Sequence, residues 1–424
     1  MAERLDYLFI GDDFTGASDT LASLARAGRK VRLFLDPPPP DALQREALDA
    51  VGIATEWRAL GPDAIRAQIA RLAPSIRALN PRFVHYKICS TWDSAPQTGN
   101  IAAAVAALDA IFAPAFIGLI GGQPSLGRYC LFGNLFARGP DGQIHRIDRH
   151  PVMRQHPITP MDEADLRLHL ARQGLTGMEL EHLAMLEGGL PALQTRMVDR
   201  LASGRRHVLF DVAEDRHLHR IGQLFHAMAA VRPLLAVGAS SVAEAIHPPL
   251  PTSPLGRIAP AMAAGPDLVI AGSRSSLTAT QVAQAAGYRK LAIAPDDLAD
   301  SAALERLAAR LVAILATGAN ALAHLSPDAE YRLDGHALSQ RLAALTLAVL
   351  ERQPLRLLTV AGGDTSSIIV RQLGFESLAY EAQVEPGVAL CSLRARDGSP
   401  LAMRVILKGG QMGSAGLFDR LLEQ

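Results

Sequence analysis

The segment with the clearest chemical potential is 359–374, TVAGGDTSSIIVRQLG, near the C-terminus. It begins at the end of a predicted strand, and Gly362 and Gly363 then allow a tight turn and a close approach of the backbone to a ligand. Residues 367–373 predict a helix that ends at Gly374. The candidate N-caps are Asp364, Thr365 and Ser366. Because a helix N-terminus offers free N–H groups and a partial positive charge, the segment predicts either a phosphate-binding loop or an ordinary capped helix.

The carboxylate of Asp364 would repel a phosphate, so a phosphate-binding loop needs another reason to contain it. Asp364 can ligate Mg²⁺, or it can act as a general base that takes a proton from the attacking hydroxyl. The sequence leaves both roles open, and it does not identify the metal ligands.

Two further loops resemble this one in composition. Residues 272–276, GSRSS, follow a predicted strand at 267–271, and residues 408–413, KGGQMG, follow a predicted strand at 403–407. None of the loops has Walker A spacing, and no GxGxxG motif follows a predicted strand, which disfavours a P-loop NTPase and an NAD enzyme. The candidate nucleotide-binding residues are Ser273, Ser275, Gly362, Gly363, Asp364, Thr365, Lys408, Gly409, Gly410 and Gly413.

A second group of polar residues lies in the N-terminal half, at the ends of predicted strands. Asp12 and Asp13 follow the strand 7–10, and two adjacent carboxylates there suit a cation or the hydroxyl groups of a sugar. The alternative is a helix cap with a solvated neighbour. Lys87 lies late in the strand 83–88, where it can bind a carboxylate or, on an edge strand, face water.

Arg128 has two readings as well, since it can pair bidentately with a carboxylate or lie on the surface. The candidate substrate-binding residues are Asp12, Asp13, Thr15, Arg58, Lys87, Ser90, Thr91 and Arg128.

The elements that must position these residues alternate between strands and helices along most of the chain. Apolar runs predict strands at 7–10, 31–35, 51–55, 83–88, 116–120, 208–210, 234–237, 267–271, 291–294, 321–325 and 403–407. Periodic segments predict helices between them, including 18–27, 64–79, 100–111, 163–173, 216–229 and 278–286. This order predicts two α/β domains with largely parallel sheets and ligands bound in the cleft between them. The expected parts are an N-terminal domain at 1–246, a linker at 247–260 with five prolines, and a C-terminal domain at 261–424.

Composition excludes several classes of protein. The 42 basic and 42 acidic residues balance, so no electrostatic footprint for nucleic acid or a membrane surface is expected. The three cysteines form no CxxC pair, and there is neither a signal-peptide pattern nor an apolar run of about 20 residues, which favours a reducing cytoplasm. His145, His150 and His156 share no helical face, which disfavours a metal site. Residues 238–241, GASS, lack the second glycine of a GxSxG nucleophile elbow.

Taken together, the motifs resemble those of the four-carbon acid sugar kinases. The matching segments are GDDFTGASD at 11–19, YKICSTWDS at 86–94, TGN at 98–100, GR at 127–128, HPITPM at 156–161, GSRSSLTATQ at 272–281, AGGDTSS at 361–367, PGV at 386–388 and LKGGQMG at 407–413. They occur in the family's order over nearly the whole chain. GASS at 238–241 and KGGQMG at 408–413 differ from the usual family forms.

The resemblance implies a sugar-acid-binding N-terminal domain and a nucleotide-binding C-terminal domain. It also implies transfer of a phosphoryl group from ATP, with Mg²⁺, to the terminal hydroxyl of threonate, erythronate or 3-oxo-tetronate. The alternative is a non-catalytic sensor of sugar acids with nucleotide as an effector, which would not need Asp364. A homo-oligomer is compatible with either function.

Overall fold

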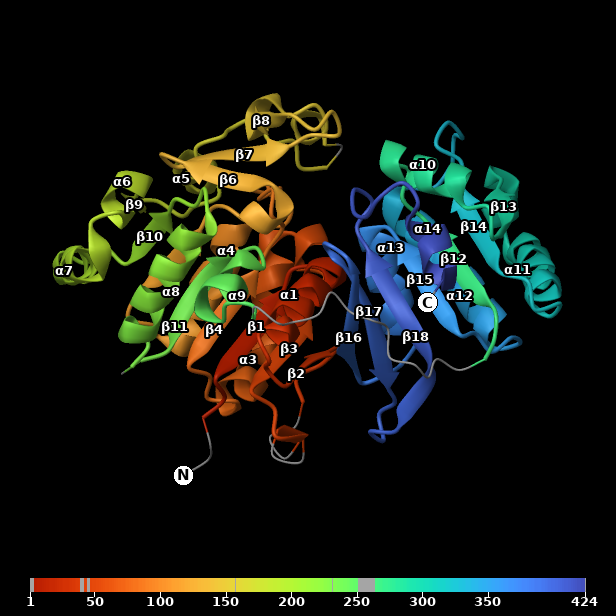
Figure 1. Cartoon of the computed structure of the whole chain (residues 1–424), viewed down its shortest axis with the longest axis horizontal. Helices are drawn as coiled ribbons and strands as arrows, with labels where there is room; N and C mark the ends of the chain where they lie inside the picture. Colours follow the sequence, from red (N-terminus) through yellow and green to blue (C-terminus); the bar gives the residue numbers. More distant parts are fainter. Residues whose placement is uncertain are drawn as a thin grey trace. The chain divides into compact units, whose positions relative to one another are not determined.

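The chain forms two α/β units, residues 1–251 and 252–424 (Figure 1). The computed structural model describes residues 4–38, 42–43, 46–156, 158–230, 232–250 and 264–423, without the side chain of Asp364. Residues 251–260 of the predicted linker therefore lie outside the described residues. The predicted fold class, two α/β domains with largely parallel sheets, is confirmed, whereas the ligand cleft between the domains stays a prediction.

The sheet of the first unit has the order β2-β3-β1-β4-β11-β5-β10-β9, and all of its pairings are parallel. Its strands are β1 (Tyr7–Gly11), β2 (Val31–Phe34), β3 (Ala50–Ala54), β4 (Phe83–Lys87), β5 (Ile117–Ile120), β9 (Glu179–Glu181), β10 (His207–Phe210) and β11 (Leu234–Gly238). Gly11 is in register with both Ala54 and Lys87, and Lys87 is in register with Gly238. The loops after these four strands therefore leave the sheet side by side at its carboxyl edge.

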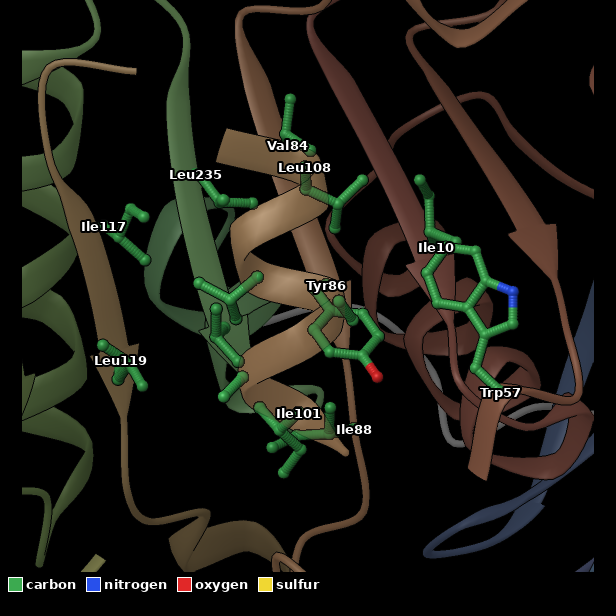
Figure 2. Packing of buried hydrophobic residues seen from close by; sticks show 14 of the residues in the cluster. Ile10, Trp57, Val84, Tyr86, Ile88, Ile101, Leu108, Ile117, Leu119 and Leu235 are labelled. Carbon is green, nitrogen blue, oxygen red and sulfur yellow. The ribbon is translucent and has the colours of Figure 1, made fainter. Parts of the chain in front are cut away.

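Helices cover both faces of this sheet in Figure 1, as expected for strands that are apolar along their whole length. They are α1 (Phe14–Arg26), α3 (Pro62–Ala78), α4 (Ile101–Phe112), α5 (Leu166–Ala171), α6 (Leu183–Leu186), α7 (Gly189–Ala202), α8 (Asp215–Met228) and α9 (Ser241–Ile246). Figure 2 shows Ile101 and Leu108 of α4 packed near Val84, Tyr86 and Leu235 of the sheet. All five are at most 2% exposed, and burial of each such side chain contributes about 1.5–3 kcal/mol.

A separate antiparallel sheet, β6-β7-β8, belongs to the same unit. Its strands are β6 (Arg128–Leu131), β7 (Asn134–Arg138) and β8 (Ile144–Arg146). The hairpin turn predicted at 139–142 joins β7 to β8, where the Gly139 N–H donates to the Gln143 carbonyl oxygen at 2.8 Å. The three strands themselves were not predicted, since their sequences lack a clear alternation of apolar and polar residues.

The second unit has the strand order β13-β14-β12-β15-β18-β17-β16, in which the first five strands are parallel and the last three form an antiparallel meander. The strands are β12 (Asp267–Ala271), β13 (Arg289–Ile293), β14 (Ala321–Leu325), β15 (Leu357–Ala361), β16 (Ser377–Glu385), β17 (Val388–Arg394) and β18 (Pro400–Lys408). The helices are α10 (Ser276–Gln284), α11 (Ser301–Leu315), α12 (Gly335–Leu350), α13 (Gly363–Gln372) and α14 (Leu417–Arg420). Ala271, Ala361 and Lys408 lie in register, so three loops leave this sheet together.

Three helices have an end that differs from the prediction by more than two residues. Helix α13 begins at Gly363 instead of residue 367, because Gly362, with φ of 132°, turns the chain directly from β15 into the helix and is its N-cap. Asp364, Thr365 and Ser366 therefore lie in the first turns of the helix and do not cap it. Helix α1 begins at Phe14, four residues earlier than predicted, and α5 is shorter than the segment 163–173.

No helix in the described residues combines the length and apolar character needed to cross a membrane. The three cysteines, Cys89, Cys130 and Cys391, form no disulfide.

Candidate functional site

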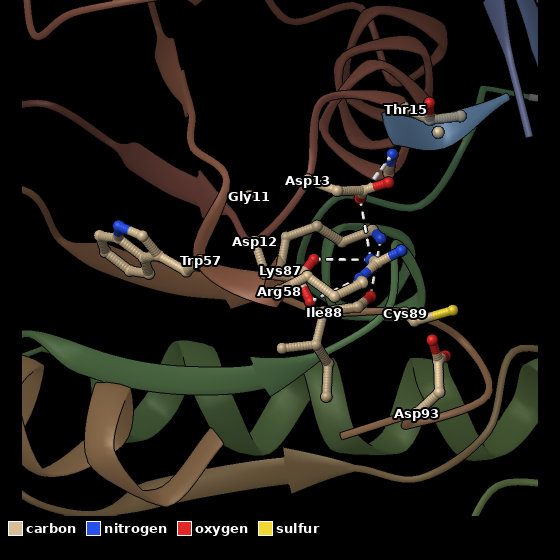
Figure 3. Close-up of polar contacts among 12 residues, drawn as sticks. Gly11, Asp12, Asp13, Thr15, Trp57, Arg58, Lys87, Ile88, Cys89 and Asp93 are labelled. Carbon is tan, nitrogen blue, oxygen red and sulfur yellow. Dashed lines mark hydrogen bonds and ion pairs between the residues drawn. The ribbon is translucent and has the colours of Figure 1, made fainter. Parts of the chain in front are cut away.

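Arg58 joins two strand ends at the carboxyl edge of the first sheet. It lies in the short 3-10 helix η1 (Trp57–Ala59) after β3, and its backbone N–H donates to the Asp12 carbonyl oxygen at 3.0 Å. Its guanidinium donates to both carboxylate oxygens of Asp12, at 3.1 and 2.7 Å, and to Asp13 Oδ1 at 2.9 Å (Figure 3). The register of β1 with β3 brings these residues together, as predicted from their positions at strand ends.

Asp13 is a helix cap, which is one of the alternatives that the sequence offered for the acidic pair. Its Oδ1 accepts a hydrogen bond from the Gly16 N–H at 2.9 Å and so caps α1, and the same oxygen pairs with Arg58. Asp12 is not a solvated neighbour, because it is only 4% exposed. Burial raises the pKa of Asp12, Arg58 lowers it and Asp13 raises it, and the net pKa lies above the ordinary value. Both carboxylates can accept hydrogen bonds from ligand hydroxyls.

Lys87 lies at the end of β4, between β1 and β11, so the edge-strand alternative is wrong. The residue is 3% exposed, and its Nζ donates to the Ile88 carbonyl oxygen at 2.7 Å. In the described part of the chain Nζ has no other hydrogen-bond acceptor, which leaves two of its three protons for a ligand. Gly16 makes room for this ammonium, since a Cβ added there would lie 2.6 Å from Nζ. A buried lysine with unused donors suits a carboxylate ligand.

The loop after β4 adds a third carboxylate, that of Asp93, near Arg58. Thr91 Oγ1 donates to Asp93 Oδ1 at 2.6 Å and contacts Cys89 Sγ at 3.0 Å. Burial raises the pKa of Asp93. Arg58, Cys89 and Thr91 together lower it by more than burial raises it, so the net pKa is below the ordinary value. Burial raises the pKa of Cys89 to about 12, so this thiol is neutral and a poor nucleophile. Ser90 lies half-buried in the same loop.

Several buried polar atoms around this edge have no partner among the described residues. They are Thr15 Oγ1, Trp92 Nε1, Gln123 Oε1, Arg128 Nε and Ser241 Oγ. Each one follows β1, β4, β5 or β11 in the chain. An unpaired buried polar atom costs about 1–3 kcal/mol, so these five atoms favour a ligand with several polar groups at this edge. Other unpaired buried atoms of the first unit lie elsewhere, for example in α8 and β2. Thr15 and Arg128 were predicted as site residues. Gln123 belongs to none of the motifs, and Ser241 lies in the GASS segment 238–241, which was considered only as a nucleophile elbow and as a departure from the family form.

The three predicted glycine loops of the second unit lie next to one another. The Ser273 N–H donates to the Ala361 carbonyl oxygen and the Gly362 N–H to the Lys408 carbonyl oxygen, both at 2.9 Å. Thr365 Oγ1 contacts Ser339 Oγ at 3.2 Å and closely approaches the first loop. The structure therefore brings together the residues predicted for nucleotide binding, at the carboxyl ends of β12, β15 and β18.

Side chains from outside the loop hold residues 409–414 in place. Ser275 Oγ and Thr278 Oγ1 donate to the Gly410 carbonyl oxygen at 2.6 and 3.0 Å. Gln281 Nε2 donates to the carbonyl oxygens of Met412 and Ser414 at 3.1 and 2.8 Å. Ser275 thus supports the loop and caps α10. The predicted contact of Ser275 with the nucleotide stays a prediction.

The opposite side of this loop is held by Glu385, at the end of β16. Its carboxylate accepts hydrogen bonds from the N–H and, at 2.8 Å, the hydroxyl of Ser414, and it pairs with Arg420 at 2.9 Å. Gly413 adopts a φ of 84° between these supports. In the described residues no acceptor is paired with the N–H groups of Gly410 and Gln411, which suits an anion. The loop is therefore ordered by contacts that leave these donors available.

Lys408 supplies the positive charge of this region. It is fully buried, its Nζ donates to Thr278 Oγ1 at 3.4 Å, and it lies 5.9 Å from the centroid of the Phe418 ring. Burial lowers the pKa of Lys408 to about 8, and Glu385 offsets this only in part. The ammonium is thus charged near neutral pH and can neutralise phosphate oxygens.

Asp364 lies in the first turn of α13, beside these loops, and its side chain is outside the described part. In the described residues no group of three His, Cys, Asp or Glu side chains is arranged to hold a metal ion.

Comparison with known proteins matches each unit to a family model. Residues 7–246 match the model of a sugar-binding N-terminal domain, and residues 268–418 match that of a nucleotide-binding C-terminal domain. The chain is similar to the 3-oxo-isoapionate kinase of Paraburkholderia graminis, at 32% identity over 98% of this chain and 93% of that protein. It is similar to the 3-oxo-tetronate kinase of Methylobacterium radiotolerans, at 31% identity over 98% of each chain.

Solved structures share the fold. A Salmonella typhimurium LT2 protein matches with a TM-score of 0.78 and 24% identity, over 99% of each chain. Haemophilus influenzae protein HI1011 matches with a TM-score of 0.72 and 24% identity, over 98% of this chain and 99% of that one. With both domain models matched in order and relatives above 30% identity over nearly the full length, the chain belongs to the family of four-carbon acid sugar kinases, which joins a sugar-binding N-terminal domain to a nucleotide-binding C-terminal domain.

Proposed function

We propose that this protein transfers the γ-phosphoryl group of ATP to the terminal hydroxyl of a short sugar acid. The candidate acceptors are 3-oxo-tetronate and 3-oxo-isoapionate, which are taken from the names of the relatives, together with threonate and erythronate. The observation that carries the proposal is the buried ammonium of Lys87, which has unused donors beside the carboxylates of Asp12 and Asp13. A cation next to hydroxyl acceptors matches a ligand that has both a carboxylate and several hydroxyls.

In this mechanism Lys87 binds the carboxylate of the acid, and Arg128 contributes further positive charge. Asp12 and Asp13 accept hydrogen bonds from its hydroxyls, while Arg58 keeps these two carboxylates in place. The binding energy of these groups positions the terminal hydroxyl for attack.

The phosphates of ATP bind to N–H groups of the glycine loops, and Lys408 neutralises part of their charge. Asp364 either takes the proton of the attacking hydroxyl or helps to hold Mg²⁺. When bound, Mg²⁺ neutralises the charge that builds on the phosphate oxygens.

A coupled assay of ADP release on a panel of these candidate acids tests the proposal. We expect ADP release that depends on both the acid and ATP. A protein that binds an acid and ATP but releases no ADP would instead be the non-catalytic sensor.

A further inference from the structure

Three of the unpartnered buried atoms, Gln123 Oε1, Arg128 Nε and Ser241 Oγ, lie after β5 and β11. Gln123 is 1% exposed and Ser241 is fully buried, so water has little access to them. The two strands are neighbours in the sheet, with Gly238 in register with Ile120. None of the interactions described for Arg58 or Lys87 involves these three atoms.

The backbone places Gln123 beside Arg128. The two residues form an isolated antiparallel bridge in which the Gln123 N–H donates to the Arg128 carbonyl oxygen at 2.9 Å and the reverse bond measures 3.1 Å. Residues directly opposite in such a bridge carry their side chains on the same face, about 5 Å apart at Cβ. An amide and a guanidinium therefore extend side by side.

Glu244 determines whether the oxygen or the nitrogen of the Gln123 side-chain amide is free to bind a ligand. Gln123 Nε2 donates to Glu244 Oε1 at 3.4 Å, and Ser125 Oγ donates to the same oxygen at 2.9 Å. An ionised carboxylate only accepts hydrogen bonds, so it fixes the amide nitrogen toward itself and leaves Oε1 as a free acceptor. Ser241 precedes Glu244 by three residues on α9, which puts both on one face of that helix.

Glu244 is ionised at mildly alkaline pH. Burial and the nearby Asp19 raise its pKa, whereas Ser125, Arg26 and Gln123 lower it, and the result is a pKa of about 7. The acceptor state of Glu244 therefore prevails at pH 8.

Arg128 supplies the complementary donor. Its Nη1 donates to the Leu126 carbonyl oxygen at 2.6 Å, whereas its Nε–H has no partner among the described residues. A hydroxyl group fits between these two atoms, because it can donate a hydrogen bond to Gln123 Oε1 and accept one from Arg128 Nε. A ketone can only accept, and a carboxylate would be repelled by Gln123 Oε1. Burial lowers the pKa of Arg128 below its ordinary value, and the nearby Asp93 offsets this only in part. Asp93 also acts on the pKa of Arg58, so this one carboxylate links the pair electrostatically to the predicted acid site.

We propose that Gln123, oriented by Glu244, is a specificity-determining residue that recognises a secondary hydroxyl of the sugar acid. Gln123 Oε1 accepts the hydroxyl proton in a hydrogen bond, and Arg128 Nε donates to the same oxygen. This inference rests on the proposed function and adds a contact that selects acids with a hydroxyl at one particular carbon.

Calorimetric titration of the full-length protein at pH 8 tests this role without requiring turnover. The probes are threonate or erythronate, whichever binds more tightly, and its two deoxy analogues, 3,4-dihydroxybutanoate and 2,4-dihydroxybutanoate. We expect one analogue to bind wild-type protein about 10- to 100-fold more weakly than the parent acid, the range for a buried polar group left unpaired. Gln123→Met should abolish this difference by weakening only the parent acid. The matched control is Gln223→Met, at an exposed glutamine of α8 in the same unit.

The outcomes separate this inference from the proposed function. Equal affinity of wild-type protein for the parent acid and both analogues would show that Gln123 does not recognise a hydroxyl. An equal loss of affinity for all three acids in Gln123→Met would show the same. Circular dichroism would show whether Gln123→Met folds. If it does not fold, the wild-type comparison still overturns the inference when no hydroxyl is selected. If wild-type protein binds an acid selectively but the coupled assay yields no ADP, the kinase proposal fails and the hydroxyl contact stands.

Discussion

At the scale of single residues, Lys87 carries the most specific prediction about the acid. Lys87→Met keeps most of the side-chain volume but removes the charge, so we expect the sugar acid to bind about 10- to 150-fold more weakly, as for the loss of a hydrogen bond from a charged group. ATP affinity should remain nearly unchanged. Calorimetry with each ligand measures both effects, and Lys30→Met, at an exposed lysine of the same unit, is the control. An equal loss of acid and ATP binding would contradict this division of labour.

Asp364 tests the chemistry directly. Asp364→Asn keeps the size of the side chain and removes its charge, so kcat should fall by about 10²- to 10⁴-fold if the carboxylate is the general base. A purely structural aspartate in the first helical turn contributes only about 0.3–1 kcal/mol through the helix dipole. Near-normal kcat at saturating ATP, Mg²⁺ and acid would therefore limit Asp364 to that structural role and move the base to Asp12 or Asp13.

Lys408 predicts a pH dependence of nucleotide binding. Burial lowers its pKa to about 8, so in the free protein it is protonated below this pH and loses its charge as the pH rises through it. The Kd for ADP, measured by calorimetry between pH 6.5 and 9.5, should thus increase above pH 8. Lys408→Met should bind more weakly at neutral pH and lose this dependence. The same pH profile in both proteins would assign the effect to another group.

How far the sequence predicts a site residue depends on what holds that residue in place. Asp12, Arg58 and Lys87 were predicted because each lies at or just after a strand end, and parallel strands bring their ends together. Gln123 was missed because its position depends on an isolated bridge to Arg128 and a contact with a helix more than a hundred residues away. No local pattern encodes such contacts.

At the scale of elements, α10 and the end of β16 hold the loop 409–414. Gln281→Leu removes two hydrogen bonds to the Met412 and Ser414 carbonyl oxygens, so we expect the KM for ATP to rise about 10-fold with little change in the KM for the acid. Steady-state kinetics with each substrate varied measures this difference. Gln284→Leu, at an exposed position of the same helix, is the matched control. A fall in kcat alone, with both KM values unchanged, would show that the loop is not positioned for binding.

Elements with strong local signals were predicted well, and those that depend on backbone geometry were not. Most of the parallel strands are short apolar runs, which the sequence shows plainly. The parallel strand β9, with the sequence ELE, is not apolar and was not predicted. The early start of α13 depends on the φ of 132° at Gly362, which a glycine permits but does not require. The small sheet β6-β7-β8 lacks an alternating pattern, so only its hairpin turn was visible.

At the scale of the whole molecule, we propose that the first unit binds the acid and the second unit binds the nucleotide. Each assignment rests on the loops at the carboxyl edge of that unit's own parallel strands. The family models match the same two parts of the chain, at residues 7–246 and 268–418. If the reaction needs a ligand on each unit, neither the acid nor ATP should be converted when it is present alone.

The most direct test of the account is to identify the product of the full-length protein incubated with ATP, Mg²⁺ and each four-carbon acid. Phosphorus NMR and mass spectrometry would determine where the phosphoryl group goes. We predict a monophosphate ester on the terminal carbon of one acid, formed in equal amount to ADP, and no ADP without the acid. ADP formed together with free phosphate at the same rate with and without every acid would contradict the central claim.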